Sequence, residues 1–158
     1  MLLGVTIYGM GGGHMLKDIP EIISPDLMKI LMEMGHGDEI CFGDANFPAQ
    51  SVGERVIRCD GHSNTALLDA VLQFLPLDIF QKKPVALMQR VREEDPVPKV
   101  WETYRKIIKK NDFSKAFTDF EMVEHHAFYL RAQKCYAVVA TSEREPYGCI
   151  ILTKGIIF

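Results

Sequence analysis

The sequence predicts a single α/β domain with three layers (α/β/α), in which helices cover both faces of a mainly parallel or mixed β-sheet. Segments whose apolar residues recur at helical spacing alternate along the chain with short apolar runs, which is the order expected when helices connect strands. Several of these runs are apolar throughout, as is typical of strands covered on both faces. With 158 residues, 47% of them hydrophobic, the chain is long enough to bury one substantial core.

The first helix is expected to begin at the segment 24–26, which offers a capping serine, a proline at the first helical position and an acid in the first turn. Apolar residues then follow at the spacing of one helical face, namely Leu27, Ile30, Leu31 and Met34. Gly35 comes directly after this stripe. We expect it to end the helix in the left-handed conformation.

The remaining elements follow from the same two periodicities. Apolar or alternating runs predict strands at 40–42, 55–59, 84–88, 120–123, 136–140 and 149–152. Helical spacing predicts helices at 65–75, 99–111 and 127–134, and a loop is expected after Pro48. Asn64 is expected to cap the helix at 65–75. The basic residues of 99–111 suit either a phosphate partner or a solvated helix face, and the acidic balance of the chain favours the solvated face.

The domain is expected to span residues 15–158, because the sequence holds no internal repeat and no low-complexity stretch. Residues 1–14 end in a triple glycine and His14, and they lack the basic start and small-residue cleavage site of a signal peptide. We therefore expect a non-native leader there, joined to a natural start at Met15.

Charge and cysteine usage exclude several classes of protein. A net charge of −3 and a pI near 5.9 give no general attraction to nucleic acid or to an anionic membrane surface. No apolar run approaches the roughly 20 residues of a membrane span. The four cysteines, Cys41, Cys59, Cys135 and Cys149, show neither CxxC pairs nor zinc-ligand spacing, and the first three lie in apolar runs. Such reduced cysteines are typical of a cytoplasmic protein.

The stretch 35–48 carries the strongest functional signal. His36 and Asp38 precede the expected strand at 40–42, and Asp44 follows it. Carboxylates and an imidazole on loops held by packed elements are where acid–base chemistry tends to occur. The ordinary alternative is that the glycines shape a helix-to-strand turn, that His36 is solvated and that Asp44 caps a turn.

The letters G-H-G-D-E at 35–39 and D-A-N-F-P at 44–48 resemble the opening signature of the L-fucose mutarotases. These enzymes are a branch of the family that also holds the D-ribose pyranases, and the likeness extends from Met15 to Phe158. It implies a ribose-pyranase-like fold and an isomerase that interconverts the α- and β-anomers of free L-fucose, with pyranose–furanose exchange of D-ribose as a further reaction. It also implies a ring of subunits, often a decamer, with the site near subunit contacts.

The resemblance assigns roles to individual residues. His36 stands at the position of the catalytic acid, and Asp44 at that of a sugar-binding aspartate. His125 replaces the arginine of the fucose mutarotases, at a position where the ribose pyranases carry histidine. The family's Y-G-N segment, which contacts the sugar, corresponds here to Tyr147, Gly148 and Cys149. The thiol in place of the amide is a weak donor and acceptor.

Ring opening of a sugar needs two proton movements, and histidine suits both near neutral pH. No cofactor or metal is expected, because nothing is oxidised and no carbon–hydrogen bond breaks. His62 is expected to be solvated and His126 to pack, and the histidine spacings match no local zinc signature. A sugar-binding module without catalysis remains the alternative. Asp38 suits either an orienting role beside His36 or a turn cap.

Overall fold

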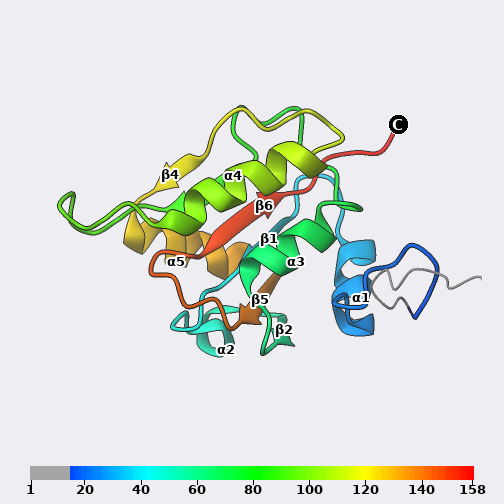
Figure 1. Ribbon diagram of the computed structural model, residues 1–158, viewed down its shortest axis with the longest axis horizontal. Helices are drawn as coiled ribbons and strands as arrows, with labels where there is room; N and C mark the ends of the chain where they lie inside the picture. Colours follow the sequence, from blue (N-terminus) through cyan, green and yellow to red (C-terminus); the bar gives the residue numbers. More distant parts are fainter. Residues whose placement is uncertain (1–14) are drawn as a thin grey trace, which may run out of the picture.

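The computed structural model describes residues 15–158, so the expected leader at 1–14 lies outside the described residues. Five helices and six strands follow in the order α1 (Pro25–Glu33), β1 (Glu39–Phe42), α2 (Ala49–Val52), β2 (Val56–Cys59), α3 (Asn64–Val71), β3 (Val85–Met88), α4 (Lys99–Asn111), β4 (Glu121–Val123), α5 (His125–Lys134), β5 (Ala137–Thr141) and β6 (Ile150–Thr153) within the described part of the chain. Figure 1 shows α3 and α4 in front of the sheet and α5 behind it. The expected α/β domain is confirmed.

The sheet is mixed, with the strand order β2-β5-β1-β6-β3-β4. Strand β1 pairs in parallel with β5 and antiparallel with β6, which places Phe42 opposite Ile150. Strand β6 also runs antiparallel to β3, while β3 and β4 are parallel. Five strands therefore end at the edge where β6 begins. We call this edge the carboxyl edge, and the opposite one the amino edge.

Two apolar cores fill the space between the layers, because successive residues of a strand point to opposite faces of the sheet. Ile40 and Phe42 of β1 join the core beneath α1, α3 and α4. Cys41, between them in sequence, joins the core beneath α2 and α5, where Phe128 and Ala132 pack. The strands are buried on both faces, which explains their continuous apolar runs. No helix within residues 15–158 is long and apolar enough to cross a bilayer.

The turn after α1 differs from the expectation. The helix ends at Glu33, and Met34 already has an extended conformation (φ −62°, ψ 134°). Gly37, and not Gly35, has the left-handed backbone, with φ +85°. The Gly35 amide donates to the Asp38 carboxylate at 2.8 Å. Asp38 therefore closes the polar turn. Of the two roles expected for it, orienting His36 or capping the turn, the structure shows the turn cap.

Three further boundaries differ from the prediction. The cap of α3 is Ser63, whose side chain accepts from the Ala66 amide, so the expected cap at Asn64 was wrong. Helix α5 begins at His125, two residues early, because the Glu124 carboxylate accepts two amides of its first turn. The expected loop after Pro48 contains the short helix α2.

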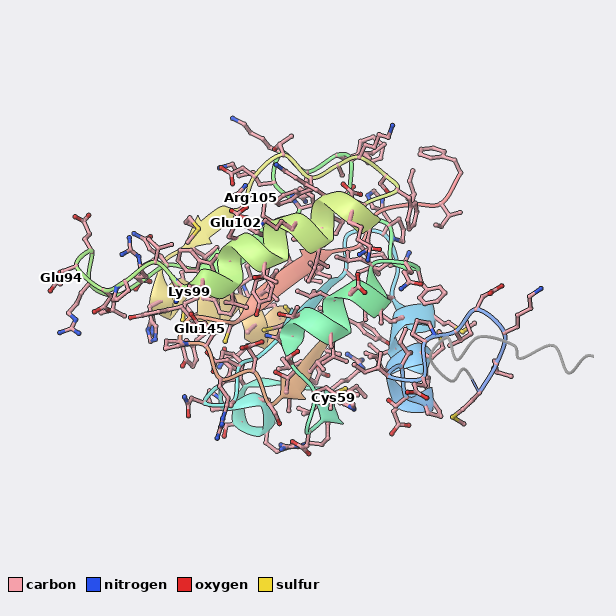
Figure 2. All side chains as sticks on the ribbon, in the orientation of Figure 1. Cys59, Glu94, Lys99, Glu102, Arg105 and Glu145 are labelled. Atoms are coloured by element: carbon pink, nitrogen blue, oxygen red, sulfur yellow. The ribbon has the colours of Figure 1, made fainter. Side chains whose placement is uncertain are left out.

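The thiol of Cys59 makes the stability of the fold sensitive to alkali. Cys59 ends β2, at the bottom of Figure 2, and is buried. Burial, with a smaller contribution from the Asp60 carboxylate, raises the pKa of the thiol to about 11. An unfolded cysteine titrates at about 8.5. The folded state therefore keeps its proton over a pH range in which the unfolded state loses it.

We predict that the unfolding free energy of the wild type exceeds that of Cys59→Ala by a constant amount below about pH 8. This difference should shrink as the pH rises further. The sign follows from the raised pKa, since ionisation of the unfolded thiol favours unfolding until the folded thiol also ionises near pH 11. Urea unfolding at a series of pH values measures the difference. Two curves that stay parallel from neutral to alkaline pH would contradict the prediction.

Candidate active site

A pocket of about 270 Å³ opens at the carboxyl edge of the sheet. Its polar wall consists of Asp44, Asn46, His125 and Tyr147, and its apolar wall of Phe47, Met88, Tyr129, Pro146 and Cys149. Gly148 lies between two of the lining residues in sequence. The pocket thus contains four of the five residues expected to hold the sugar, and Gly148 adjoins it in the chain. We call this cavity the carboxyl-edge pocket.

Asp44 is held from two sides directly after β1. Its own amide donates to the Cys149 sulfur at 3.3 Å, and its Oδ1 accepts from the Asn46 amide at 3.0 Å. Oδ2 has no hydrogen-bond partner among the described residues. One carboxylate oxygen therefore fixes the turn, while the other is available to accept hydroxyl protons of a ligand. Burial, followed by the Asp44 charge, raises the pKa of Cys149, so this thiol stays protonated.

An aromatic row forms the apolar wall of the pocket. The His125 ring lies 5.0 Å from the Tyr129 ring, which lies 5.1 Å from the Phe47 ring (centroid distances). Tyr129 is one helical turn after His125, so the two side chains share a face of α5. Tyr129 was not among the residues predicted to hold the sugar, because a helix beginning at residue 127 does not place it on one face with His125. The signal that could have identified Tyr129 is Glu124 as the helix cap, because a helix that begins after it places His125 and Tyr129 on one face.

Tyr147 has a strained backbone that its neighbours hold in place. Its φ of +56° lies in the left-handed region, which a bulky residue rarely adopts. Its carbonyl accepts from Trp101 Nε1 at 2.8 Å. Its hydroxyl donates to Asp95 at 3.1 Å and accepts from the Val91 amide at 3.2 Å. The tyrosine therefore ties the loop at 89–98 to the rim of the pocket.

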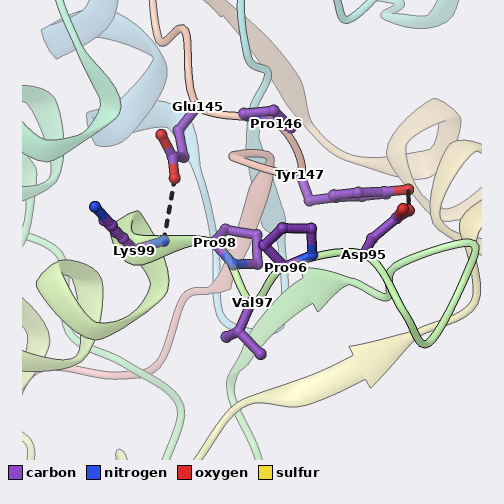
Figure 3. Close-up of a pocket in the computed structure, with 8 residues that line it drawn as sticks. All are labelled: Asp95, Pro96, Val97, Pro98, Lys99, Glu145, Pro146 and Tyr147. Atoms are coloured by element: carbon purple, nitrogen blue, oxygen red, sulfur yellow. Dashed lines mark hydrogen bonds between the residues drawn. The ribbon is translucent and has the colours of Figure 1, made fainter.

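Figure 3 shows the Tyr147 hydroxyl against Asp95, with Pro96 and Pro98 beside the ring. These residues line a second cavity, of about 450 Å³, that shares Tyr147 and Pro146 with the carboxyl-edge pocket. Figure 2 shows the loop at 89–98 projecting from the body, with Glu94 near its tip. Desolvation acts to raise the pKa of Asp95, but hydrogen bonds from Arg92 and Tyr147 outweigh it and lower that pKa.

Gly148 is supported from the interior of the protein. Its carbonyl accepts from Asn64 Nδ2 at 2.9 Å and from the Tyr104 hydroxyl at 2.7 Å, and both side chains are fully buried. A Cβ at Gly148 would come within 2.8 Å of the Glu145 carbonyl oxygen, so glycine is required there. The polar residue mispredicted as a helix cap, Asn64, is thus part of the support of the pocket.

His36 lies at the other end of β1, on the amino edge. Its Nε2 is 3.1 Å from Asp78 Oδ1, and its ring is 5.6 Å from the Phe80 ring. The four residues of β1 alone span about 13 Å. His36 and Asp44 of one chain therefore do not face the same cavity, in keeping with the expectation that they lie at opposite ends of this strand.

The remaining histidines stand apart from the pocket. His62 and His126 are both exposed, as expected for the first but not for the second. His126 is solvated because α5 begins before it and turns its position away from the core. Among residues 15–158 there is no group of three or more histidine, cysteine, aspartate or glutamate side chains that could hold a metal ion.

Fold and pocket together define an α/β protein with a small, partly polar pocket at the carboxyl edge of its sheet, where open α/β sheets commonly bind ligands. The sequence model of the RbsD / FucU transport protein family matches residues 17–157. The chain belongs to this family.

Solved structures agree with this assignment. The fucose mutarotase from Streptococcus pneumoniae in complex with L-fucose is 44% identical, with a TM-score of 0.83 over 90% of this chain and 100% of that one. FucU from Bifidobacterium longum is 40% identical, with a TM-score of 0.82 over 89% and 99%. RbsD from Bacillus subtilis complexed with D-ribose, at 22% identity and a TM-score of 0.64 over 86% and 95%, shows a similar fold.

We predict that Tyr147→Phe releases the loop at 89–98 without opening the fold. The Val91 amide and the Asp95 carboxylate both lose their partner on the tyrosine hydroxyl. Hydrogen exchange at the Val91 amide should accelerate at least about tenfold, as a lost hydrogen bond to a structured loop would allow. The pKa of Asp95 should rise toward its ordinary value but stay below it, since Arg92 remains.

Tyr129→Phe is the matched control. Tyr129 lines the same pocket, but its hydroxyl makes no hydrogen bond to the described residues. It should leave the exchange of Val91 unchanged. Equal effects of the two substitutions would contradict the assigned role of the Tyr147 hydroxyl.

Proposed function

We propose that this chain is a fucose mutarotase, an isomerase that interconverts the α- and β-anomers of free L-fucose by acid–base opening and reclosure of the ring. The observation that carries the proposal is its 44% identity, over nearly the whole of both chains, to a fucose mutarotase solved with L-fucose. The reaction oxidises nothing and breaks no carbon–hydrogen bond. The protein therefore needs to supply only binding and proton transfer.

The carboxyl-edge pocket suits a monosaccharide in size and chemistry. Asp44 offers a carboxylate oxygen to sugar hydroxyls, and His125 offers an imidazole. Met88 and the rings of Phe47 and Tyr129 form a wall for the carbon–hydrogen face of a sugar and for the methyl group of a deoxyhexose. D-ribose is the second candidate substrate, because His125 stands where the ribose pyranases are expected to carry histidine.

We infer that the active site forms between two copies of the chain. His36 of one copy would enter the carboxyl-edge pocket of the next, since no single chain brings the two together. The surface beside His36 is apolar and open at Phe80, whose ring lies 5.6 Å from the imidazole and which is 69% exposed. Contact between two different edges is head-to-tail, which forms a ring when the rotation between successive copies closes. A decameric ring, located in the cytoplasm, and a functional unit of residues 15–158 are part of this proposal.

The proposed chemistry is a cycle of two protons. Protonated His36 donates to the ring oxygen as the bond from that oxygen to the anomeric carbon breaks, and a base in the pocket accepts the proton of the anomeric hydroxyl. The resulting aldehyde rotates and recloses on either face, and both protons return. The Asp44 carboxylate and the His125 imidazole are the available acceptors. Such acid–base assistance contributes about 10²–10⁴-fold to the rate.

Exchange between the anomeric resonances of L-fucose, followed by saturation-transfer NMR, tests the proposal. We expect the wild type to accelerate exchange, His36→Ala to abolish it, and Asp44→Asn to abolish it by weakening the hold on the sugar. A refolded equimolar mixture of the two variants should regain about a quarter of the activity, because one interface in four combines the intact edges.

Each other outcome has a definite meaning. Binding of L-fucose by the wild type without exchange would make the chain a sugar-binding module and overturn the enzyme. Activity that the mixture fails to restore, although both variants fold and assemble, would overturn the shared site. D-ribose and D-galactose in the same assay show which sugar the His125 pocket prefers.

A further inference from the structure

A third cavity adjoins the carboxyl-edge pocket, and the proposed function does not use it. It has a volume of about 230 Å³ and is lined by Gln89, Arg90, Val91, Glu124 and His125. His125 also lines the carboxyl-edge pocket, so the two cavities share one imidazole. The carboxyl-edge pocket, proposed to hold a whole monosaccharide, is only slightly larger at about 270 Å³. We call the third cavity the Arg90 cavity.

The register of the sheet brings the residues of the Arg90 cavity together. Strands β3 and β4 are parallel, with Met88 opposite Val123, and the Gln89 amide donates to the Val123 carbonyl at 2.7 Å. Both segments therefore leave the sheet side by side at the carboxyl edge, on the left of Figure 1, one into the loop at 89–98 and the other into α5. The pairing of the two strands thus places the cavity, and not the loop alone.

Arg90 is held at one nitrogen and leaves the rest of its guanidinium unused. Nη1 donates to the Glu93 carbonyl at 2.9 Å and also to the Asp95 carbonyl. Nε and Nη2 have no hydrogen-bond partner among the described residues, and no carboxylate among them forms an ion pair with Arg90. The Asp95 carboxylate is instead bonded by Arg92 and by the Tyr147 hydroxyl. The planar group therefore has a fixed orientation and keeps free donors.

Glu124 places a negative charge in the same cavity. Its Oε1 accepts from the His126 amide at 3.0 Å, and its Oε2 accepts from the Ala127 amide at 2.9 Å. These two hydrogen bonds lower the pKa of Glu124, so the carboxylate is charged at neutral pH. Each oxygen keeps capacity for another hydrogen bond. A cation and an anion, both held by backbone groups, thus line one cavity without forming an ion pair with each other.

This arrangement favours hydroxyl groups over a charged ligand. Arg90 would attract a phosphate or a carboxylate, but Glu124 would repel it. A hydroxyl group both donates and accepts, so it can bind to the guanidinium and to the carboxylate. The side-chain amide of Gln89, which has no partner in the described part of the chain, offers a further donor and acceptor. The Arg90 cavity therefore suits a neutral, hydroxyl-bearing group.

We infer that the Arg90 cavity is a second subsite of the sugar site, which binds a hydroxyl-bearing substituent that L-fucose lacks. The inference rests on the proposed function, in which Met88 forms part of the wall for the methyl group of a deoxyhexose. Gln89 follows Met88 directly and lines the Arg90 cavity, so a hydroxymethyl group in place of that methyl has this cavity beside it. The substrates then include free hexoses. L-galactose, which is L-fucose with a hydroxyl group on its methyl carbon, is the simplest of them.

The test compares L-galactose with L-fucose in the full chain, because the two sugars differ by one hydroxyl group. Saturation-transfer NMR measures anomeric exchange, and isothermal titration calorimetry measures Kd independently of turnover. We expect the wild type to bind L-galactose at least as tightly as L-fucose. Arg90→Met keeps the length of the side chain but removes its donors. It should weaken binding of L-galactose at least about tenfold and binding of L-fucose by less than about twofold.

Two further variants separate the subsite from the loop. Gln89→Ala removes a side chain that bonds to no described residue, and it should weaken binding of L-galactose alone, by about threefold. Arg92→Met breaks the contact to Asp95 within the same loop, but Arg92 lines neither cavity. This variant should leave the preference between the two sugars unchanged.

A wild type that binds L-galactose more weakly than L-fucose would overturn the inference, and this measurement needs no variant to fold. Equal losses for both sugars in Arg90→Met, or equal effects of Arg90→Met and Arg92→Met, would also overturn it. Binding of L-galactose that depends on Arg90, without anomeric exchange of either sugar, would overturn the proposed function and support the subsite. Exchange of L-fucose in a chain whose binding of L-galactose is indifferent to Arg90 would do the reverse.

Discussion

The rigid extension of β1 is the constraint on which the rest of the structure depends. Hydrogen bonds to β5 on one side and to β6 on the other keep the strand straight at the centre of the sheet. Its two ends carry the two side chains predicted to take part in the reaction, His36 and Asp44, and the strand holds them apart. A single copy thus presents an acid–base group on one edge and a ligand pocket on the other. In the proposed function, a second copy joins them.

The two ends of β1 are anchored by different kinds of interaction. At the start of the strand, the Glu39 carboxylate accepts hydrogen bonds from two nitrogens of Arg131, the shortest at 2.6 Å. The Glu121 carboxylate accepts from another nitrogen of the same guanidinium at 2.8 Å. Burial acts to lower the pKa of Arg131, but the two carboxylates outweigh it and raise that pKa. At the end of the strand, neutral donors on Asn64 and Tyr104 hold the backbone that closes the pocket. The charged anchor thus lies at the opposite end of the strand from the carboxyl-edge pocket of the same chain.

Local sequence signals were sufficient for the layers and for most elements, because strands buried on both faces and amphipathic helices have distinct periodicities. These local signals failed where contacts between distant parts of the chain determine the position of a side chain. Asn64 looks like a helix cap, but Ser63 caps and Asn64 turns inward to Gly148. Asp78 lies in an unremarkable turn, and only the passage of Lys154 and Gly155 beside it brings its carboxylate to His36. The residues proposed to hold the sugar were predicted through resemblance, since nothing in their spacing joins 44, 125 and 147.

The departure at Cys149 shows how the pocket tolerates a changed residue. The resemblance implies an amide at this position that contacts the sugar. Here the sulfur faces inward, accepts from the Asp44 amide and is almost fully buried. Its raised pKa keeps it an uncharged thiol beside a carboxylate, so it does not repel that acid. Cys149 therefore fixes Asp44, and in the proposed function the sugar hydroxyls are left to Asp44 and His125. We propose that substrate preference then depends on the imidazole in place of the arginine, because the buried thiol faces inward.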